Sequence, residues 1–159
     1  RALGYCVENI TSMASHNGGS NNLQEVINNH VALKGLGFNA EQIVRMASQG
    51  GGSKNLQAVT DNHVALKGVG FSVEQIVRMV SHDGGSKNLQ AVTVGYTELS
   101  KVWSCEFIAS HVQNAGSKRI YQQLKLLNTA NALVSLWPEI DSDIINGVSF
   151  ESSAGSLRP

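Results

Sequence analysis

The sequence predicts an all-α fold, a right-handed superhelical α-solenoid built from two-helix repeats of about 33 residues. One observation behind this prediction is that the same motif recurs three times, over residues 5–37, 38–70 and 71–102. A second is that paired glycines divide each copy into two segments with helical periodicity. Because neither short helix has enough apolar surface to be stable alone, neighbouring copies should stack and bury that surface together.

A capping signal and a short apolar face predict the first helix of each repeat. Asn39 and Ser72 stand where an N-cap belongs, and a glutamine follows each of them three residues later, as in a capping box. The apolar face has the same residues in the second and third repeats, Ile43, Val44 and Met46, then Ile76, Val77 and Met79. We expect the helix to end at the glycine pairs 51–52 and 84–85, because consecutive glycines favour loops and positive φ angles.

Apolar residues spaced three or four apart predict a second, longer helix in each repeat. In the second repeat the buried stripe is expected to contain Leu56, Val59, His63 and Leu66. Gly68 and Gly70 should end this helix before the aromatic residue that opens the next repeat. Stacked repeats would align the loops between first and second helices along one edge of the protein. Such a ladder of loops can match a linear polymer that has a constant rise per monomer.

The remaining segments are interpreted by comparison with this repeat. Residues 1–4 align with the last residues of a copy, so we interpret them as the end of a truncated preceding repeat. Residues 103–136 are interpreted as a degenerate fourth repeat, which lacks one residue before Ala115. Residues 137–159 begin with acidic residues and end rich in glycine and serine, which predicts a polar C-terminal cap and a flexible tail.

Composition is that of an ordinary soluble protein and gives no direct sign of a nucleic-acid partner. The formal net charge is zero, because acidic residues after Trp137 cancel a slight positive charge in the repeats. No apolar run is long enough to span a bilayer and no signal peptide is visible, so no membrane partner is predicted. Cys6 and Cys105 have neither metal-site nor disulfide spacing, and we expect them to pack as small side chains.

No set of residues in the sequence has the pattern of a catalytic site or a metal site. His30 and His63 are equivalent positions one repeat apart, which favours packing over metal binding. The Gly-Gly-Ser loops lack the residues of a nucleotide-binding P-loop, and no serine has a recognisable set of catalytic partners. We therefore predict a protein that is not an enzyme and that has no metal, no cofactor and no small-molecule substrate.

The repeated pattern E-Q-I-V-R-M-x-S, a variable pair, then G-G-S-K-N-L-Q-A-V resembles the repeats of transcription activator-like effectors, and especially their diverged TALE-like relatives from marine organisms. The resemblance covers residues 1–102 well and residues 103–136 loosely. It implies a monomer that binds double-stranded DNA sequence-specifically, each repeat reading one base in the major groove. It also implies an intracellular, DNA-associated location, either in the bacterial cytoplasm and nucleoid or in a host nucleus.

The resemblance implies that the second residue of each variable pair approaches the base edge, and its chemistry then suggests the base. The carboxylate of Asp83 accepts a hydrogen bond from the amino group of cytosine, and Gly50 leaves room for the methyl group of thymine. Asn17 can donate to a purine N7, which favours G and tolerates A. Read in the direction of the family, the target is 5′-(G/A)-T-C-3′. Whether Asn114 adds a fourth position stays open.

The other loop residues are expected to hold the loop or to contact phosphate. The first residues of the pairs resemble brace residues that bond back to a first-helix carbonyl: His16, Gln49 and His82. Backbone N–H groups at a helix N-terminus suit a phosphate oxygen, and lysine adds charge beside them, which predicts phosphate contacts at Gly18, Gly19, Gly51, Gly52, Lys54, Gly84, Gly85 and Lys87. Arg45 and Arg78 are expected either to attract DNA at long range or to lie on a solvated helix face.

An α-solenoid that serves as a protein–protein interaction scaffold is the alternative function. Helical repeats commonly bind proteins on a concave face, and a neutral chain suits this role. The pattern of variation favours DNA instead. Protein-binding repeats usually vary at scattered helix positions, whereas these copies differ most consistently at one loop pair, without the tyrosine, tryptophan and arginine typical of protein hot spots.

Overall fold

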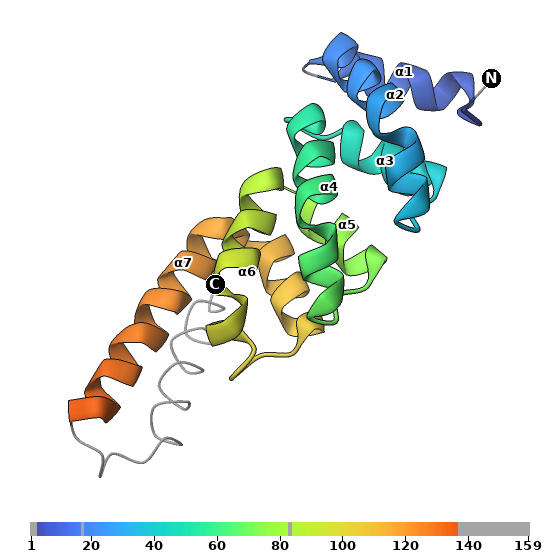
Figure 1. Cartoon of the computed structure of the whole chain (residues 1–159). Helices are drawn as coiled ribbons and strands as arrows, with labels where there is room; N and C mark the ends of the chain where they lie inside the picture. Colours follow the sequence, from blue (N-terminus) through green and yellow to red (C-terminus); the bar gives the residue numbers. More distant parts are fainter. Residues whose placement is uncertain (1–2, 17, 83, 137–159) are drawn as a thin grey trace.

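The computed structural model describes residues 3–16, 18–82 and 84–136, and this part of the chain is all-α without any strand (Figure 1). The prediction of an all-α protein is therefore confirmed. Predictions for residues 1–2 and 137–159 lie outside the described residues. Seven helices are present within them: α1 Val7–Ser15, α2 Gly19–Gly35, α3 Ala40–Ala47, α4 Gly52–Gly68, α5 Val73–Val80, α6 Gly85–Leu99 and α7 Cys105–Leu136.

The first helices of the second and third repeats begin at the predicted capping boxes. The Gln42 N–H donates to Asn39 Oδ1 (2.8 Å) and the Asn39 N–H donates to Gln42 Oε1 (2.9 Å). Ser72 and Gln75 make the same reciprocal pair at the start of α5. Both helices end before the glycine pair, at Ala47 and at Val80. The predicted ends were thus too late, because residues 48–49 and 81–82 already belong to the loop.

The paired glycines form the end of the loop that leads to the second helix. Each of the two positions requires glycine for a different geometric reason. The first glycine of each pair is the helix N-cap and lies in the left-handed region, with φ of 85°, 79° and 96° at Gly18, Gly51 and Gly84. The second glycine has no room for a Cβ atom. At Gly52 this atom would collide with the Ala47 carbonyl oxygen, and at Gly85 it would collide with the Asn55 side chain.

Consecutive repeats pack helix against equivalent helix, and the seven helices follow one another along the length of the molecule (Figure 1). The second helices contact in series, α2 with α4, α4 with α6 and α6 with α7, and the first helices do so from α1 through α3 and α5 to α7. One hydrophobic core runs through these contacts and contains the first-helix isoleucines Ile43, Ile76 and Ile108. Each repeat is therefore buried mainly against its neighbours.

The aromatic residue that opens each of the first three repeats packs against that repeat's second helix. His63 is 5% exposed and meets the Phe38 ring edge-on, with ring centroids 5.6 Å apart. In the first repeat a hydrogen bond of 2.9 Å joins His30 Nδ1 to the Tyr5 hydroxyl group. The prediction that these equivalent histidines serve packing is confirmed.

The fourth repeat differs from the others because its two helical segments are joined without a full loop. α7 is interrupted only at Gly116, whose φ of 71° and ψ of 177° are not helical. The missing residue of this repeat is one physical reason, since fewer residues remain to form the turn. The sequence predicted the shortened segment but not that the loop would reduce to a single non-helical residue.

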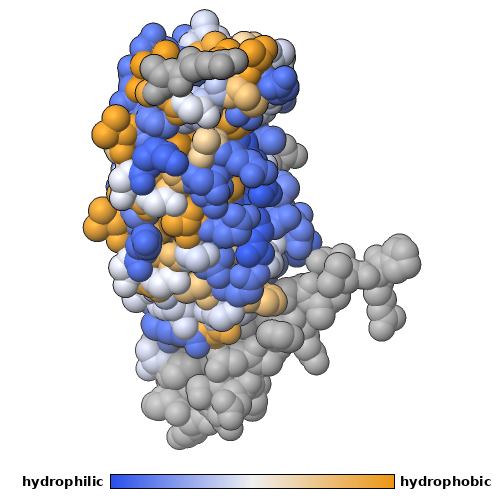
Figure 2. All heavy atoms as spheres, turned by 90° about the vertical axis from the view of Figure 1, so that its right-hand side faces the viewer, coloured by the Kyte–Doolittle hydropathy of each residue, from blue (hydrophilic) through white to orange (hydrophobic). Residues whose placement is uncertain are grey.

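Apolar residues reach the surface at separate places among hydrophilic residues on the face drawn in Figure 2. Val31 and Val64, equivalent residues of α2 and α4, are 79% and 77% exposed. None of the helices within the described ranges is long and apolar enough to cross a membrane.

Candidate nucleic-acid interface

Of the three predicted base-reading residues, the structure describes Gly50, which lies in the loop between α3 and α4. Asn17 and Asp83 lie outside the described residues. Gly50 is exposed, its φ is not positive, and no atom lies within 4 Å of the place that a Cβ would occupy. The fold therefore requires glycine at Gly51 and Gly52 but not at Gly50. Nothing within the described chain explains why this position lacks a side chain.

Of the three predicted brace residues, His16 makes the contact that the role requires. Its Nδ1 lies 2.7 Å from the Ser12 carbonyl oxygen, in the last turns of α1. Since a carbonyl oxygen only accepts, the proton is on Nδ1 and the ring donates. Among the described residues, neither Gln49 nor His82 bonds to a first-helix carbonyl, and His82 Nε2 is buried without a partner. The second and third loops are thus held in another way.

The loops of consecutive repeats lie next to one another on the same side of the helix stack. A polar groove with a volume of about 360 Å³ is lined by residues of the second, third and fourth repeats: Gln49, Ser81, His82, Gln113, Asn114, Ala115 and Gly116. Ser48, in the loop of the second repeat, shares a hydrogen bond of 3.0 Å between hydroxyl groups with Ser12 of the first repeat. The loop residues of the second, third and fourth repeats thus line one groove, and the second loop is bonded to α1 of the first repeat.

The two predicted lysines are exposed and unpaired in the described part of the chain. Lys54 and Lys87 occupy the first turns of α4 and α6, next to the loop glycines, and no carboxylate lies within ion-pair distance of either. Lys118 occupies the same place after Gly116 and is also exposed and unpaired there. The sequence signal for Lys118 was its alignment with the other two lysines. Together these residues form what we call the lysine row: Lys54, Lys87 and Lys118.

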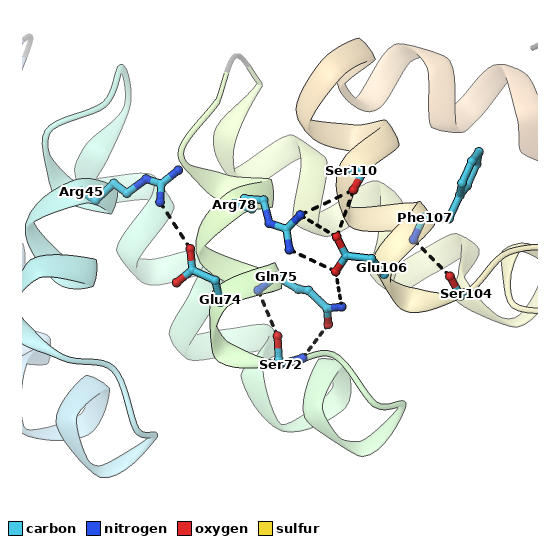
Figure 3. Close-up of polar contacts among 9 residues, drawn as sticks. All are labelled: Arg45, Ser72, Glu74, Gln75, Arg78, Ser104, Glu106, Phe107 and Ser110. Atoms are coloured by element: carbon cyan, nitrogen blue, oxygen red, sulfur yellow. Dashed lines mark hydrogen bonds and ion pairs between the residues drawn. The ribbon is translucent and has the colours of Figure 1, made fainter. Parts of the chain in front are cut away.

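The two arginines pair with glutamates of the following repeat, as Figure 3 shows. Arg45 Nη1 lies 3.4 Å from Glu74 Oε1, and Arg78 Nη1 lies 2.7 Å from Glu106 Oε1. Arg78 and then Gln75 donate hydrogen bonds to Glu106, and these bonds lower the pKa of its carboxyl group to about 2. The arginines therefore connect repeats, and their charge is balanced within the protein.

The predicted phosphate-binding glycines differ in how free their N–H groups are. The N-cap glycines Gly18, Gly51 and Gly84 have no capping side chain of their own. In α4 and α6, however, an asparagine of the preceding repeat accepts a hydrogen bond from a first-turn N–H group, so a negative ligand would have to use the other N–H groups there. The Gly85 N–H also has a partner and donates to the His82 carbonyl group (2.9 Å). Its contribution to phosphate binding would require this bond to open. The sequence pattern gave no sign of this difference between the loops.

The residues with metal-binding or redox chemistry are dispersed. Across residues 3–136, apart from the two undescribed loop positions, no group of three or more His, Cys, Asp and Glu residues is placed to hold a metal ion. Cys6 and Cys105 are free thiols, and Cys105 Sγ lies beside the Val69 carbonyl oxygen at 3.6 Å.

A comparison with protein-family models and with curated proteins finds no match for this chain.

Proposed function

We propose that this chain is a TALE-like repeat protein, a right-handed superhelical α-solenoid that binds double-stranded DNA as a monomer. Each repeat reads one base in the major groove through its loop pair, and the three full repeats select 5′-(G/A)-T-C-3′. The observation that carries the proposal is Gly50. It is a position of sequence variation, it is exposed, and the fold gives no reason for the missing side chain. A contact outside the chain supplies that reason, namely the methyl group of thymine.

The charge distribution supports a DNA ligand for the loop side of the molecule. The lysine row places one exposed cation per repeat, with no ion-pair partner among the described residues, after the first helices of the last three repeats. Phosphate contacts of this kind hold a protein in register on the duplex without reading sequence. Because the contacts are few, binding by this chain should be weak, and it should fall as salt increases with a slope of about 0.9 per phosphate contact. The protein is proposed to act by binding, without catalysis, wherever its DNA resides in the cell.

The regular stacking supports one base per repeat. Equivalent helices of consecutive repeats contact one another in series, and reading one base per repeat requires that successive loops be related by similar displacements. Duplex DNA presents its bases at a constant rise of about 3.4 Å, which a series of equally spaced loops can follow. A globular protein partner would not need this regularity.

The test is a change of specificity by one loop substitution. Binding of the full chain at low salt is measured by fluorescence anisotropy, with duplexes that contain 5′-GTC-3′ or one changed base. We expect Asp83→Gly to shift the preferred third base from C to T and to leave the second base unchanged. Asp61→Asn removes the same charge from the exposed surface of α4 and should leave every preference as it is. Base preferences that ignore Asp83→Gly would refute loop reading.

The protein-interaction scaffold remains as a second candidate because of one observation. The exposed valines Val31 and Val64 recur at the same place on neighbouring second helices. A Val31→Ser, Val64→Ser double variant separates the two functions, since DNA binding should be unaffected by it. If these valines serve protein binding, the variant loses a protein partner and keeps its fold.

A further inference from the structure

One buried asparagine in each full repeat links that repeat to the next. These residues are 0–1% exposed, and their Oδ1 atoms accept hydrogen bonds from backbone N–H groups in the following repeat. The three bonds have nearly equal lengths of 3.0, 2.9 and 2.8 Å, from Ser53 to Asn22, from Ser86 to Asn55 and from Ser117 to Asn88. We call these three residues the asparagine links.

The links also hold the loop of their own repeat. Asn88 Nδ2 donates to the Met79 carbonyl oxygen (3.0 Å), and Asn55 Nδ2 lies 3.5 Å from the Met46 carbonyl oxygen. These carbonyl groups lie in the last turn of a first helix, just before the loop. The serine that donates to Oδ1 lies in the first turn of the next second helix, just after the neighbouring loop. Asn55 and Asn88 therefore each connect two adjacent loops.

Only a primary amide satisfies both ends of a link, because one end needs an acceptor and the other needs a donor. At 0–1% exposure, water cannot replace either partner, and an unsatisfied buried group is costly. The loop glycines belong to the same arrangement, since a Cβ on Gly85 would collide with Asn55. The fourth repeat has Arg119 at the equivalent position, and the series of links ends there.

We propose that Asn22, Asn55 and Asn88 are positioning residues that set the spacing of adjacent reading loops on DNA. Apolar contacts between helices tolerate small shifts, whereas a hydrogen bond between buried groups keeps its geometry to within a few tenths of an ångström. Each link then controls base discrimination at the two positions that its loops read. This inference rests on the proposed function and adds to it the residues that maintain the register between loops.

The experiment compares Asn22→Ala and Asn55→Ala with Asn62→Ala in the full chain. Asn62 is the control because its Nδ2 donates to the Ala58 carbonyl group within α4 (2.8 Å) and makes no bond to the described residues of another repeat. Affinity is measured for duplexes changed at one of the three target positions. We expect Asn22→Ala to lose discrimination at the first and second positions, and Asn55→Ala to lose it at the second and third. The expected loss of discrimination is about fivefold or more, the size of a typical single mismatch effect. Discrimination at the third position should be unaffected in Asn22→Ala, and discrimination at the first position should be unaffected in Asn55→Ala.

A readout without DNA accompanies this measurement. Hydrogen exchange of the Ser86 amide should accelerate in Asn55→Ala and not in Asn22→Ala, and the Ser53 amide should show the reverse. If Asn55→Ala does not fold, Asn55→Ser takes its place, because a serine hydroxyl group retains a donor but does not reach Ser86. An equal loss of affinity for all duplexes would mean that the links are merely structural and would overturn the inference. A parent chain without base discrimination would instead overturn the proposed function, and this inference with it.

Discussion

The second and fourth repeats differ most at the loop, and the difference separates residues that serve stacking from residues that serve reading. The fourth repeat keeps the buried aromatic Trp103, the core Ile108 and the glutamate that accepts the Arg78 ion pair. It lacks a full loop, and its arginine at position 119 replaces the asparagine link. The fourth repeat thus keeps the residues that pack against the preceding repeat. It lacks the loop and the asparagine that would connect it to a following repeat. A terminal repeat needs the first kind only.

The largest expected effect contrasts two neighbouring glycines of the second loop. Gly52→Ala forces a Cβ into the Ala47 carbonyl oxygen, so we expect the free energy of unfolding to fall by about 1–3 kcal/mol. Gly50→Ala meets no atom and should change stability by less than about 0.5 kcal/mol while weakening the preference for thymine. Urea unfolding and DNA titration measure the two effects. Equal destabilisation by both substitutions would show that Gly50 also serves the fold.

Substitutions in the lysine row test whether the fourth repeat contacts DNA although it lacks a full loop. Lys87→Ala and Lys118→Ala should each weaken binding to all sequences alike and lower the slope of log affinity against log salt by about 1. Lys125→Ala, an exposed cation farther along α7, should leave the slope unchanged. If Lys118→Ala behaves like this control, contact with DNA ends at the third repeat.

Acid should weaken the connection between the third and fourth repeats. The Arg78 and Gln75 bonds lower the pKa of Glu106 to about 2 from an ordinary 4.5, so the pair stabilises the fold above that ordinary value. This stability is lost as pH falls toward 2. The effect is small because Glu106 is exposed and solvent screens the pair. Thermal unfolding at several pH values should show less acid destabilisation in Glu106→Gln than in the parent.

Glu41→Gln is the matched control for this pH dependence. Glu41 occupies the equivalent position of the second repeat, but the preceding repeat has Ser12 in place of the arginine. We expect its acid profile to follow that of the parent chain. An identical change of profile in Glu41→Gln and Glu106→Gln would mean that the Arg78 ion pair contributes nothing specific.

The sequence predicted the local structure well because local rules determine it. Capping boxes at Asn39 and Ser72 and the glycine pairs act over three or four residues, and the structure has helices where these signals place them. The contacts between repeats were harder to predict. Nothing in the pattern around Asn55 says that its amide reaches the next repeat, and the pairing of Arg78 with Glu106 depends on how helices stack. Such contacts follow from tertiary packing.

The candidate site shows the same division between local signals and packing. Periodicity identified the loops, the variable pairs and two of the lysines, because each recurs in register. Differences among copies of one motif were not visible in the sequence: the His16 ring bonds to Ser12, whereas His82 has no such bond, and the Gly85 N–H is occupied by the loop itself. Nearly identical sequences relax differently when their neighbours differ.

The smallest expected effect concerns Asn114, whose role as a fourth reader the sequence leaves open. The residue is exposed, but it precedes the single non-helical residue Gly116 and has no loop to project it from the helix. We therefore expect Asn114→Ala to leave base preference unchanged at the position after 5′-GTC-3′, as measured with four duplexes that differ there. Asp83→Ala is the positive control and should reduce the preference for C. A preference that changes with Asn114→Ala would mean that the helix end itself can read a base, and the boundary between reading and stacking repeats would move to the fourth repeat.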